Sequence, residues 1–355
     1  MTSSDEIFMR RALELALLGQ GKVAPNPMVG CVIVHENKII GEGWHQQYGG
    51  PHAEVNAINA VADKSLLPAS RIYVTLEPCS HYGKTPPCAD LLIQHGVKDV
   101  IICNTDPNPL VKGAGIRKLL DTGCQVHVGL LEEEGLHLNR CFFTFHTQKR
   151  PYIILKWAET ADGFIGKTDG TQLNISNNLS KKLVHKWRTE LPAIMVGTRT
   201  ALLDNPQLNT RAWSGKNPTR IVLDKYLQLP GHLNLFNQSQ PTLVYNFNKQ
   251  ETLPNLEKVK LDEREALLPT LLQDLYNRQL NGVLVEGGAV LLNSFIRTGL
   301  WDEAYVFKSN FHLAEAGVAA PTLPLAFLKH LSPVATDKLF IYTNSQVKLP
   351  IAGEE

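Results

Sequence analysis

The sequence predicts an α/β protein with two domains, and three observations support this prediction. The chain has 355 residues, more than the roughly 250 to 300 that one hydrophobic core organises. Short apolar runs alternate with segments whose apolar residues recur at helical spacing, which is typical of an α/β layer with a partly parallel sheet. A polar, proline-ended stretch at 147–151 interrupts this alternation before a fresh strand begins. We therefore expect one domain over 1–147 and a second over 148–355.

The composition excludes several classes of protein. A hydrophobic fraction of 43% with 19% charged residues excludes disorder, collagen and coiled coil for the chain as a whole. The 35 Lys+Arg nearly balance the 34 Asp+Glu, so we expect a small-molecule partner and no nucleic acid. The charged start MTSSDEIFMRR and the lack of a long apolar run predict neither export nor a membrane span. We expect a cytoplasmic protein and, as a general prior for soluble enzymes, a homo-oligomer.

The first domain is expected to open with a helix over Asp5–Leu18, because its apolar residues recur at roughly helical spacing behind a Ser/Asp start. A hairpin should follow, in which Val29–Val34 and Lys38–Gly43 flank a turn at 35–37 and the loop Pro25-Asn26-Pro27 leads into it. The remaining expected elements are a helix from His52, a strand Arg71–Leu76, a helix Cys88–His95, a strand Asp99–Cys103, a helix after Gly113, a strand Gln125–Val128 and a helix from Leu130.

The second domain repeats the α/β pattern. It should begin with the strand Tyr152–Trp157, directly after the polar boundary. The further expected elements are a helix Leu179–Thr189, strands Ala193–Val196, Thr219–Leu223 and Thr242–Tyr245, a helix Ala266–Arg278, a strand Gly282–Glu286 and a helix through Phe295.

The strongest motif of the first domain combines His52-Ala53-Glu54 with Cys79 and Cys88. One imidazole and two thiolates give Zn²⁺ three protein ligands and leave a fourth position for water, as in catalytic zinc sites. Glu54 is then placed to reach that water and to carry its proton to a leaving amino group. The motif predicts hydrolytic deamination of a nitrogen heterocycle, with a structural zinc site or no metal as the alternatives. The other cysteines, Cys31, Cys103, Cys124 and Cys141, are expected in the core and reduced.

The segment 78–88 is longer than the short P-C-x-x-C of general zinc deaminases. Together with the segments 26–30, 51–54 and 75–79, it resembles the deaminase half of the RibD family of bifunctional riboflavin biosynthesis proteins. The resemblance implies a cytidine-deaminase-like α/β/α domain and a diaminohydroxypyrimidine substrate that carries a phosphoribosylamino group. The residues that it places near the substrate are Asn26, His81, Lys84, Asp106 and Asn108, although a solvated loop would explain the last four as well.

In the second domain, Glu286-Gly287-Gly288 ends a strand and opens a helix, where free N–H groups favour an anion. Alone this pattern is weak, because most Gly-Gly turns are only turns, and it is not the Rossmann fingerprint. With the segments 156–163, 196–211 and 286–288, however, the chain resembles the reductase half of the same family. That resemblance implies a dihydrofolate-reductase-like α/β fold that uses NADPH to reduce the ribose of the deaminated product to a ribityl chain.

The resemblance also assigns residues to the two ligands of the second domain. Cofactor contacts are expected from Ala158, Asn174, Thr200, Asp204, Gly288, Ala289, Val290, Leu291, Leu292, Asn293 and Ser294. Substrate contacts are expected from Lys156, Gln172, Arg188, Leu208, Arg211 and Glu286. Lys156 could assist proton transfer as the ribosylamine opens, and Arg188 or Arg211 could bind the 5-phosphate as a planar donor. The alternatives are an exposed helix position for Arg188 and a strand-edge position for Lys156.

Three positions depart from the family. Gln172 and Asn174 stand where the family often has serine and tryptophan, which removes an aromatic stacking surface, and Ala114 replaces the lysine of a Gly-Lys-Gly. Spacing alone does not establish NADPH over NADH. Two rival readings therefore remain: a zinc deaminase whose second domain only binds or dimerises, and a zinc-stabilised interaction protein. The second rival is disfavoured by Glu54, because a structural zinc site needs no acid beside an open position.

Overall fold

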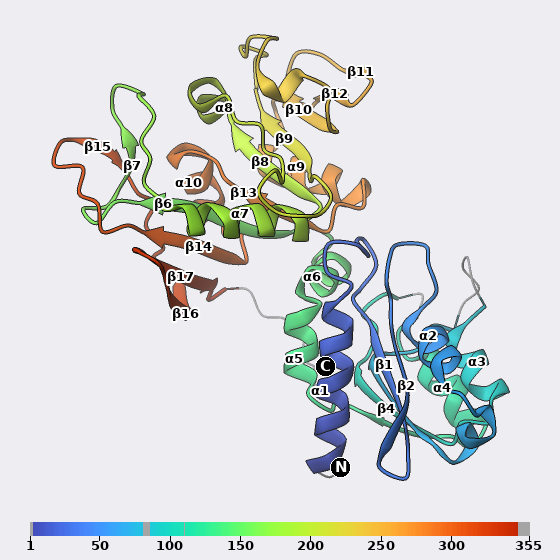
Figure 1. Cartoon of the computed structure of the whole chain (residues 1–355). Coiled ribbons are helices and arrows are strands. Elements are labelled where there is room, and N and C mark those ends of the chain that lie inside the picture. The colour runs from blue at the N-terminus through green and yellow to red at the C-terminus, as the bar shows by residue number, and fades with distance from the viewer. Residues whose placement is uncertain (1–2, 81–85, 110, 347–355) are drawn as a thin grey trace. The chain divides into compact units, whose positions relative to one another are not determined.

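The protein is described by a computed structural model for residues 3–80, 86–109 and 111–346 (Figure 1). It divides into two compact units, the first ending at Lys149 and the second beginning at Arg150. Each unit is a mixed α/β layer, so the predicted fold class is confirmed. In the described part of the chain, no helix has both the length and the apolar character that crossing a membrane requires.

A five-stranded sheet forms the centre of the first unit, in the order β2-β1-β3-β4-β5. Its strands are β1 (Gly30–His35), β2 (Lys38–Trp44), β3 (Arg71–Leu76), β4 (Asp99–Asn104) and β5 (Gln125–Val128). The β1–β2 and β1–β3 pairs are antiparallel, whereas β3, β4 and β5 run parallel. The carboxyl ends of β3 and β4 therefore lie side by side, with Leu76 opposite Asn104.

Helices pack on both faces of this sheet (Figure 1). Successive side chains of each strand point to opposite faces and contact the helices there. Val32, Tyr73 and Ile101 pack against α1, whereas Cys31, Val74 and Ile102 pack against α2, α3 and α4. The helices of the unit are α1 (Ser3–Leu17), α2 (Ala53–Ala60), α3 (Cys88–Gln94), α4 (Ala114–Asp121), α5 (Glu132–Leu138) and α6 (Arg140–Gln148), with a 3-10 turn at Lys64–Ala69. This is the predicted α/β/α arrangement.

The single helix expected from Leu130 is two helices, α5 and α6, which are separated at Asn139. The side-chain amide of Asn139 accepts from the N–H of Met28 and donates to its carbonyl oxygen, both at 2.8 Å. Asn139 thus fastens the loop before β1 to the helical break.

The second unit is built on a ten-stranded sheet in the order β11-β12-β10-β9-β8-β13-β6-β14-β17-β16. The seven strands from β12 to β14 in this order are parallel, and the outer strands at both edges are antiparallel. The strands are β6 (Tyr152–Glu159), β8 (Ala193–Gly197), β9 (Thr219–Leu223), β10 (Thr242–Asn246), β11 (Glu251–Leu253), β12 (Leu256–Lys260), β13 (Gly282–Val285), β14 (Glu303–Lys308), β16 (Ala326–Val334) and β17 (Asp337–Asn344).

Helices cover both faces of the larger sheet. On one face, a core cluster joins inward residues of β6, β8 and β13 to α9 (Leu267–Asn277) and α10 (Ala289–Thr298). On the opposite face, the indole ring of Trp187 stacks on Phe307 and meets Tyr305 edge-on, which seats α7 against β14. The remaining elements are α7 (Asn178–Glu190), α8 (Thr198–Asp204), a 3-10 turn at Asn234–Phe236 and the small sheet of β7 (Phe164–Lys167) and β15 (Gly317–Ala319).

Candidate active sites

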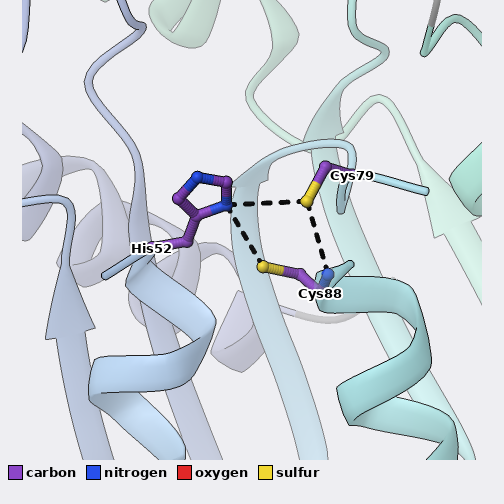
Figure 2. Close-up of side chains that lie close together, drawn as sticks. All are labelled: His52, Cys79 and Cys88. Atoms are coloured by element: carbon purple, nitrogen blue, oxygen red, sulfur yellow. Dashed lines mark hydrogen bonds between the residues drawn. The ribbon is translucent and has the colours of Figure 1, made fainter. Parts of the chain in front are cut away.

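Three predicted metal ligands lie together in the first unit (Figure 2). His52 immediately precedes α2, Cys79 follows β3, and Cys88 is the first residue of α3. The Nδ1 atom of His52 lies 3.5 Å from the sulfur of Cys79 and 3.3 Å from that of Cys88. The backbone N–H of Cys88 points at the Cys79 sulfur, 3.3 Å away.

The geometry and charge of this cluster fit a zinc ion. Zinc–sulfur and zinc–nitrogen bonds of about 2.3 and 2.05 Å in a tetrahedron separate a nitrogen from a sulfur ligand by about 3.6 Å, close to both spacings found. Hydrogen bonds from Cys88 and His52 lower the pKa of Cys79 to about 4, so one thiolate is present at neutral pH. The hydrogen bond to Cys79 raises the pKa of Cys88, whose proton leaves when a cation takes its place.

Glu54 lies on the first turn of α2, two residues beyond His52, and is 3% exposed. Burial, and then the charge of Cys79, raise its pKa to about 6, and its carboxyl group shares a hydrogen bond with Cys88. A carboxyl group with a pKa near neutrality both accepts and returns a proton readily. Its position beside the three ligands fits a proton carrier.

Asn26 is oriented by a residue that sequence reasoning missed, His45. The Nδ1 atom of His45 lies 3.0 Å from the carbonyl oxygen of Pro51, which can only accept, so Nδ1 carries the proton. Burial lowers the pKa of His45, so its Nε2 is unprotonated and accepts from the Nδ2 of Asn26 at 3.2 Å. The oxygen of the Asn26 amide is therefore turned away from His45. The His45 ring also meets His52 edge-on, with centroids 5.5 Å apart.

A second missed residue is Glu77, which directly follows β3 and is 4% exposed. Its Oε2 accepts from the N–H groups of Asp106 (3.3 Å) and Gly113 (3.0 Å). Its Oε1 accepts from those of Gly115 (3.0 Å) and Ile116 (3.3 Å). One buried carboxylate thus ties the N–H groups of these four residues to the loop after β3 that carries Cys79.

Of the other predicted substrate contacts, Asp106 and Asn108 lie in this held segment. The Asp106 carboxylate accepts from the N–H of Asn108 at 2.8 Å, and burial raises the pKa of Asp106 to about 7. His81 and Lys84 lie outside the described residues.

All six cysteines are free thiols, and of the four expected in the core, Cys141 is only half-buried.

A cavity of about 710 Å³ lies in the second unit, where β6, β8, β9 and β13 end. Ligands of parallel α/β sheets bind at this edge. The cavity is lined by these expected cofactor and substrate residues: Lys156, Ala158, Gln172, Asn174, Thr200, Asp204, Glu286, Gly288, Ala289, Val290, Leu291 and Ser294.

Five expected residues do not line the cavity. The side chain of Leu292 is fully buried in the core, because it lies on the inward face of α10. Asn293 is also absent from the lining. Among the expected substrate residues, Leu208 is 2% exposed, while Arg188 and Arg211 both hydrogen-bond to Asn209.

Glu286 carries the main electrostatic arrangement of this cavity. The guanidinium of Arg188 binds its carboxylate with two hydrogen bonds of 2.8 and 3.0 Å, and the Lys156 Nζ lies 3.7 Å away. Burial alone would raise the pKa of Glu286, but the charges of Arg188 and Lys156 outweigh it and lower the pKa to about 2. Burial lowers the pKa of Lys156, which makes its ammonium a better proton donor.

The cavity also fits an extended anionic ligand. Gly288 precedes α10 without a side-chain cap, and a Cβ atom at Gly288 would lie 3.0 Å from Thr200 Oγ1. A larger residue would crowd the approach to the N–H groups at the start of this helix. Such an open helix terminus favours a phosphate.

Both units match known families. Residues 2–104 match the family described as "Cytidine and deoxycytidylate deaminase zinc-binding region", and residues 151–312 match the "RibD C-terminal domain". Riboflavin biosynthesis protein RibD of Aquifex aeolicus is 40% identical over 311 residues, which cover 85% of this chain and 86% of that protein. The Escherichia coli protein of the same name is 35% identical over 90% of this chain and 91% of its own length.

Two solved structures match this protein over 96% of its chain. A diaminohydroxyphosphoribosylaminopyrimidine deaminase/5-amino-6-(5-phosphoribosylamino)uracil reductase of Thermotoga maritima superposes with a TM-score of 0.88 at 37% identity, over 96% of this chain and 99% of that chain. RibD of Acinetobacter baumannii gives 0.87 at 32% identity, with the same coverage.

Proposed function

The chain belongs to the RibD family, the bifunctional deaminases and reductases of riboflavin biosynthesis, and from this premise we propose its substrates, its cofactor and the residues that act on them. The first domain, 1–147, deaminates 2,5-diamino-6-(5-phosphoribosylamino)pyrimidin-4-one. The second, 148–355, reduces the ribosyl group of the product with NADPH. The observation that carries the proposal is the presence, in one chain, of the His52, Cys79 and Cys88 cluster and of a cavity with Lys156 and Glu286.

In the deaminase, His52 Nδ1 and the sulfurs of Cys79 and Cys88 would hold zinc, which when bound lowers the pKa of water. Glu54 takes a proton from the water and delivers it to the amino group that leaves as ammonia. Asn26 presents its amide oxygen to a hydrogen-bond donor of the ring, in an orientation fixed by His45. Asp106 and Asn108 lie in the segment held by Glu77, where they would meet the ribose phosphate.

In the reductase, NADPH when bound supplies the hydride. Lys156 donates a proton to the ribose ring oxygen as the ring opens to the imine, and its lowered pKa suits this transfer. Glu286 holds Lys156 and Arg188 in place as a buried anion. Arg188 and Arg211 converge on Asn209, which places two cations where the 5-phosphate of the substrate would bind.

The reading in which the second domain only binds or dimerises is not favoured, because the match to the RibD C-terminal domain spans 151–312. The lining of the cavity also retains Lys156 and Glu286 despite the departures at Gln172 and Asn174.

The test is a coupled assay on purified, metal-analysed protein that contains the phosphoribosylamino-diaminopyrimidine and NADPH. Wild type is expected to release ammonia and then to oxidise NADPH. Glu54→Gln should keep its zinc but lose ammonia release by about 10² to 10⁴-fold, because proton transfer is lost. The same variant should still oxidise NADPH when given the deaminated product.

The possible failures of this assay are distinguishable. Ammonia without NADPH oxidation would refute the reductase assignment alone. Normal deamination by Glu54→Gln would refute the role of Glu54. If zinc-loaded wild type gives neither signal, the substrate assignment is wrong.

A further inference from the structure

Two cations on the wall of the cavity stand out because the part of the chain described here provides them with no ion pair. Arg199 and Lys225 are exposed and line the cavity. The other lysines that line it have partners: Lys156 faces Glu286, Lys167 pairs with Glu315, and Lys181 donates to Asn174. Arg199 and Lys225 are therefore available to an anion.

The register of the sheet brings these cations to the same corner. Gly197 of β8 lies opposite Leu223 of β9, and Arg199 and Lys225 each follow two residues later. The Thr198 hydroxyl donates to the Leu223 carbonyl oxygen at 2.5 Å, which ties the start of α8 to the end of β9.

The turn that carries Lys225 is braced by the buried side chain of Asp224. The Asp224 carboxylate accepts from the N–H groups of Gln228 and Leu229, both at 3.0 Å, and its carbonyl oxygen accepts from Leu227. The turn is thus held by the carboxylate and the carbonyl oxygen of Asp224, while the side chains of Lys225 and Tyr226 remain exposed. Binding a ligand there requires little ordering of the chain.

Tyr226 supplies an aromatic surface in the same corner. Tyr226 is 50% exposed and lines the cavity. The hydroxyl donates to Glu263 at 2.8 Å, and the ring packs edge-on against Phe247 with centroids 5.9 Å apart. The N–H of Phe247 donates to the Lys225 carbonyl oxygen. The ring is thus held by its hydroxyl group and by Phe247 on one side, and its exposed surface is available for a ligand to stack on.

We propose that Arg199, Lys225 and Tyr226 form the subsite for the adenosine 2′-phosphate end of the cofactor, and that the two cations select NADPH over NADH. The inference rests on the proposed reductase function. The ring of Tyr226 stacks on adenine, which NADPH and NADH share. The 2′-phosphate, which NADH lacks, adds about 1.5 to 2 negative charges and accepts charge-assisted hydrogen bonds from the two cations.

The layout of the cavity suits an elongated dinucleotide. In the order β9-β8-β13-β6, three strand spacings, about 14 Å, separate the corner at Lys225 from Lys156. Gly288 and the start of α10 follow β13, between these two ends, where the diphosphate would lie.

The test is a titration of the full, zinc-loaded chain with four probes: adenosine 2′,5′-bisphosphate, 5′-AMP, NADPH and NADH. Arg199→Ala and Lys225→Ala should each weaken binding of the two 2′-phosphorylated probes about five- to tenfold and leave the other two within about twofold. The effect should shrink at high salt. Arg297→Ala is the matched control, because it removes an exposed cation at the far end of α10, outside the cavity.

Tyr226→Ala should weaken all four probes about fivefold or more, whereas Tyr226→Phe, which keeps the ring, should stay close to wild type. Equal weakening of NADPH and NADH by the two cation variants, or no weakening, would overturn the assignment while leaving the reductase proposal intact. Wild type that binds none of the probes would overturn the reductase proposal and this subsite with it.

Discussion

The buried carboxylate of Glu77 offers a sharp test of how the deaminase site is held. Four backbone N–H groups, from Asp106, Gly113, Gly115 and Ile116, share its two oxygens. In Glu77→Gln, one oxygen becomes an NH₂ group, which cannot accept. Whichever way the amide lies, two N–H donors, one buried and one partly buried, face another donor.

The structure sets the size of this effect. A buried donor left without an acceptor costs about 1 to 3 kcal/mol, so the variant should lose about 2 to 6 kcal/mol from the segment that follows β4. At about 1.4 kcal/mol per factor of ten, local opening of this segment should become about 30-fold to 10⁴-fold more frequent.

Amide hydrogen exchange followed by mass spectrometry measures this opening in peptides that cover 106–121. Glu133→Gln is the matched control, because it makes the same chemical change at an exposed position on α5. Exchange in the second unit reports that each variant is otherwise folded. If the amides of residues 113–116 exchange as slowly in Glu77→Gln as in wild type, the carboxylate does not hold this segment.

Three further predictions concern single residues. Cys88→Ser should lose zinc, measured by metal analysis, whereas Cys141→Ser should retain it, and equal zinc content would remove Cys88 from the ligand set. His45→Ala should raise the KM of deamination several-fold with a smaller change in kcat, and should leave NADPH oxidation with the deaminated product unchanged. Glu286→Gln should destabilise the second unit by about 3 kcal/mol at pH 6, because it leaves Arg188 buried without its partner. The folded pKa of Glu286, about 2, lies below the ordinary 4.5, so its stabilisation is present above pH 4.5 and is lost as the pH falls toward 2. In urea unfolding at pH 6 and pH 3, the gap between wild type and Glu286→Gln should therefore narrow at the lower pH, and a constant gap would contradict this.

The zinc cluster could be predicted because local structure places its members. His52 and Cys88 stand at helix starts, and Cys79 lies three residues beyond a largely buried strand, so the motif spacing predicts the geometry. The role of His45 could not be predicted in this way. It depends on hydrogen bonds to Asn26 and Pro51 that only the folded loop brings together.

The fold shows the same limit. Most strands in the middle of the two sheets are rich in apolar residues. By contrast, β16 is an edge strand whose residues are largely exposed, so no alternation of apolar and polar residues in the sequence indicates it. The family resemblance implies cofactor contacts along the whole stretch 288–294, but a helix turns each successive side chain by about 100°, which puts the Leu292 side chain in the core. Arg199 and Lys225 become neighbours only through the pairing of β8 with β9.

The brace at Asp224 has a consequence for how this protein can evolve. Because that carboxylate shapes the turn through backbone N–H groups, the turn does not depend on the exposed side chains of Lys225 and Tyr226. Mutations at these two positions should cost the fold little, since surface substitutions usually change stability by less than about 0.5 kcal/mol. Coenzyme preference could thus drift or be redesigned while the catalytic framework stays constant, whereas a change at Asp224 would be selected against first as a folding defect.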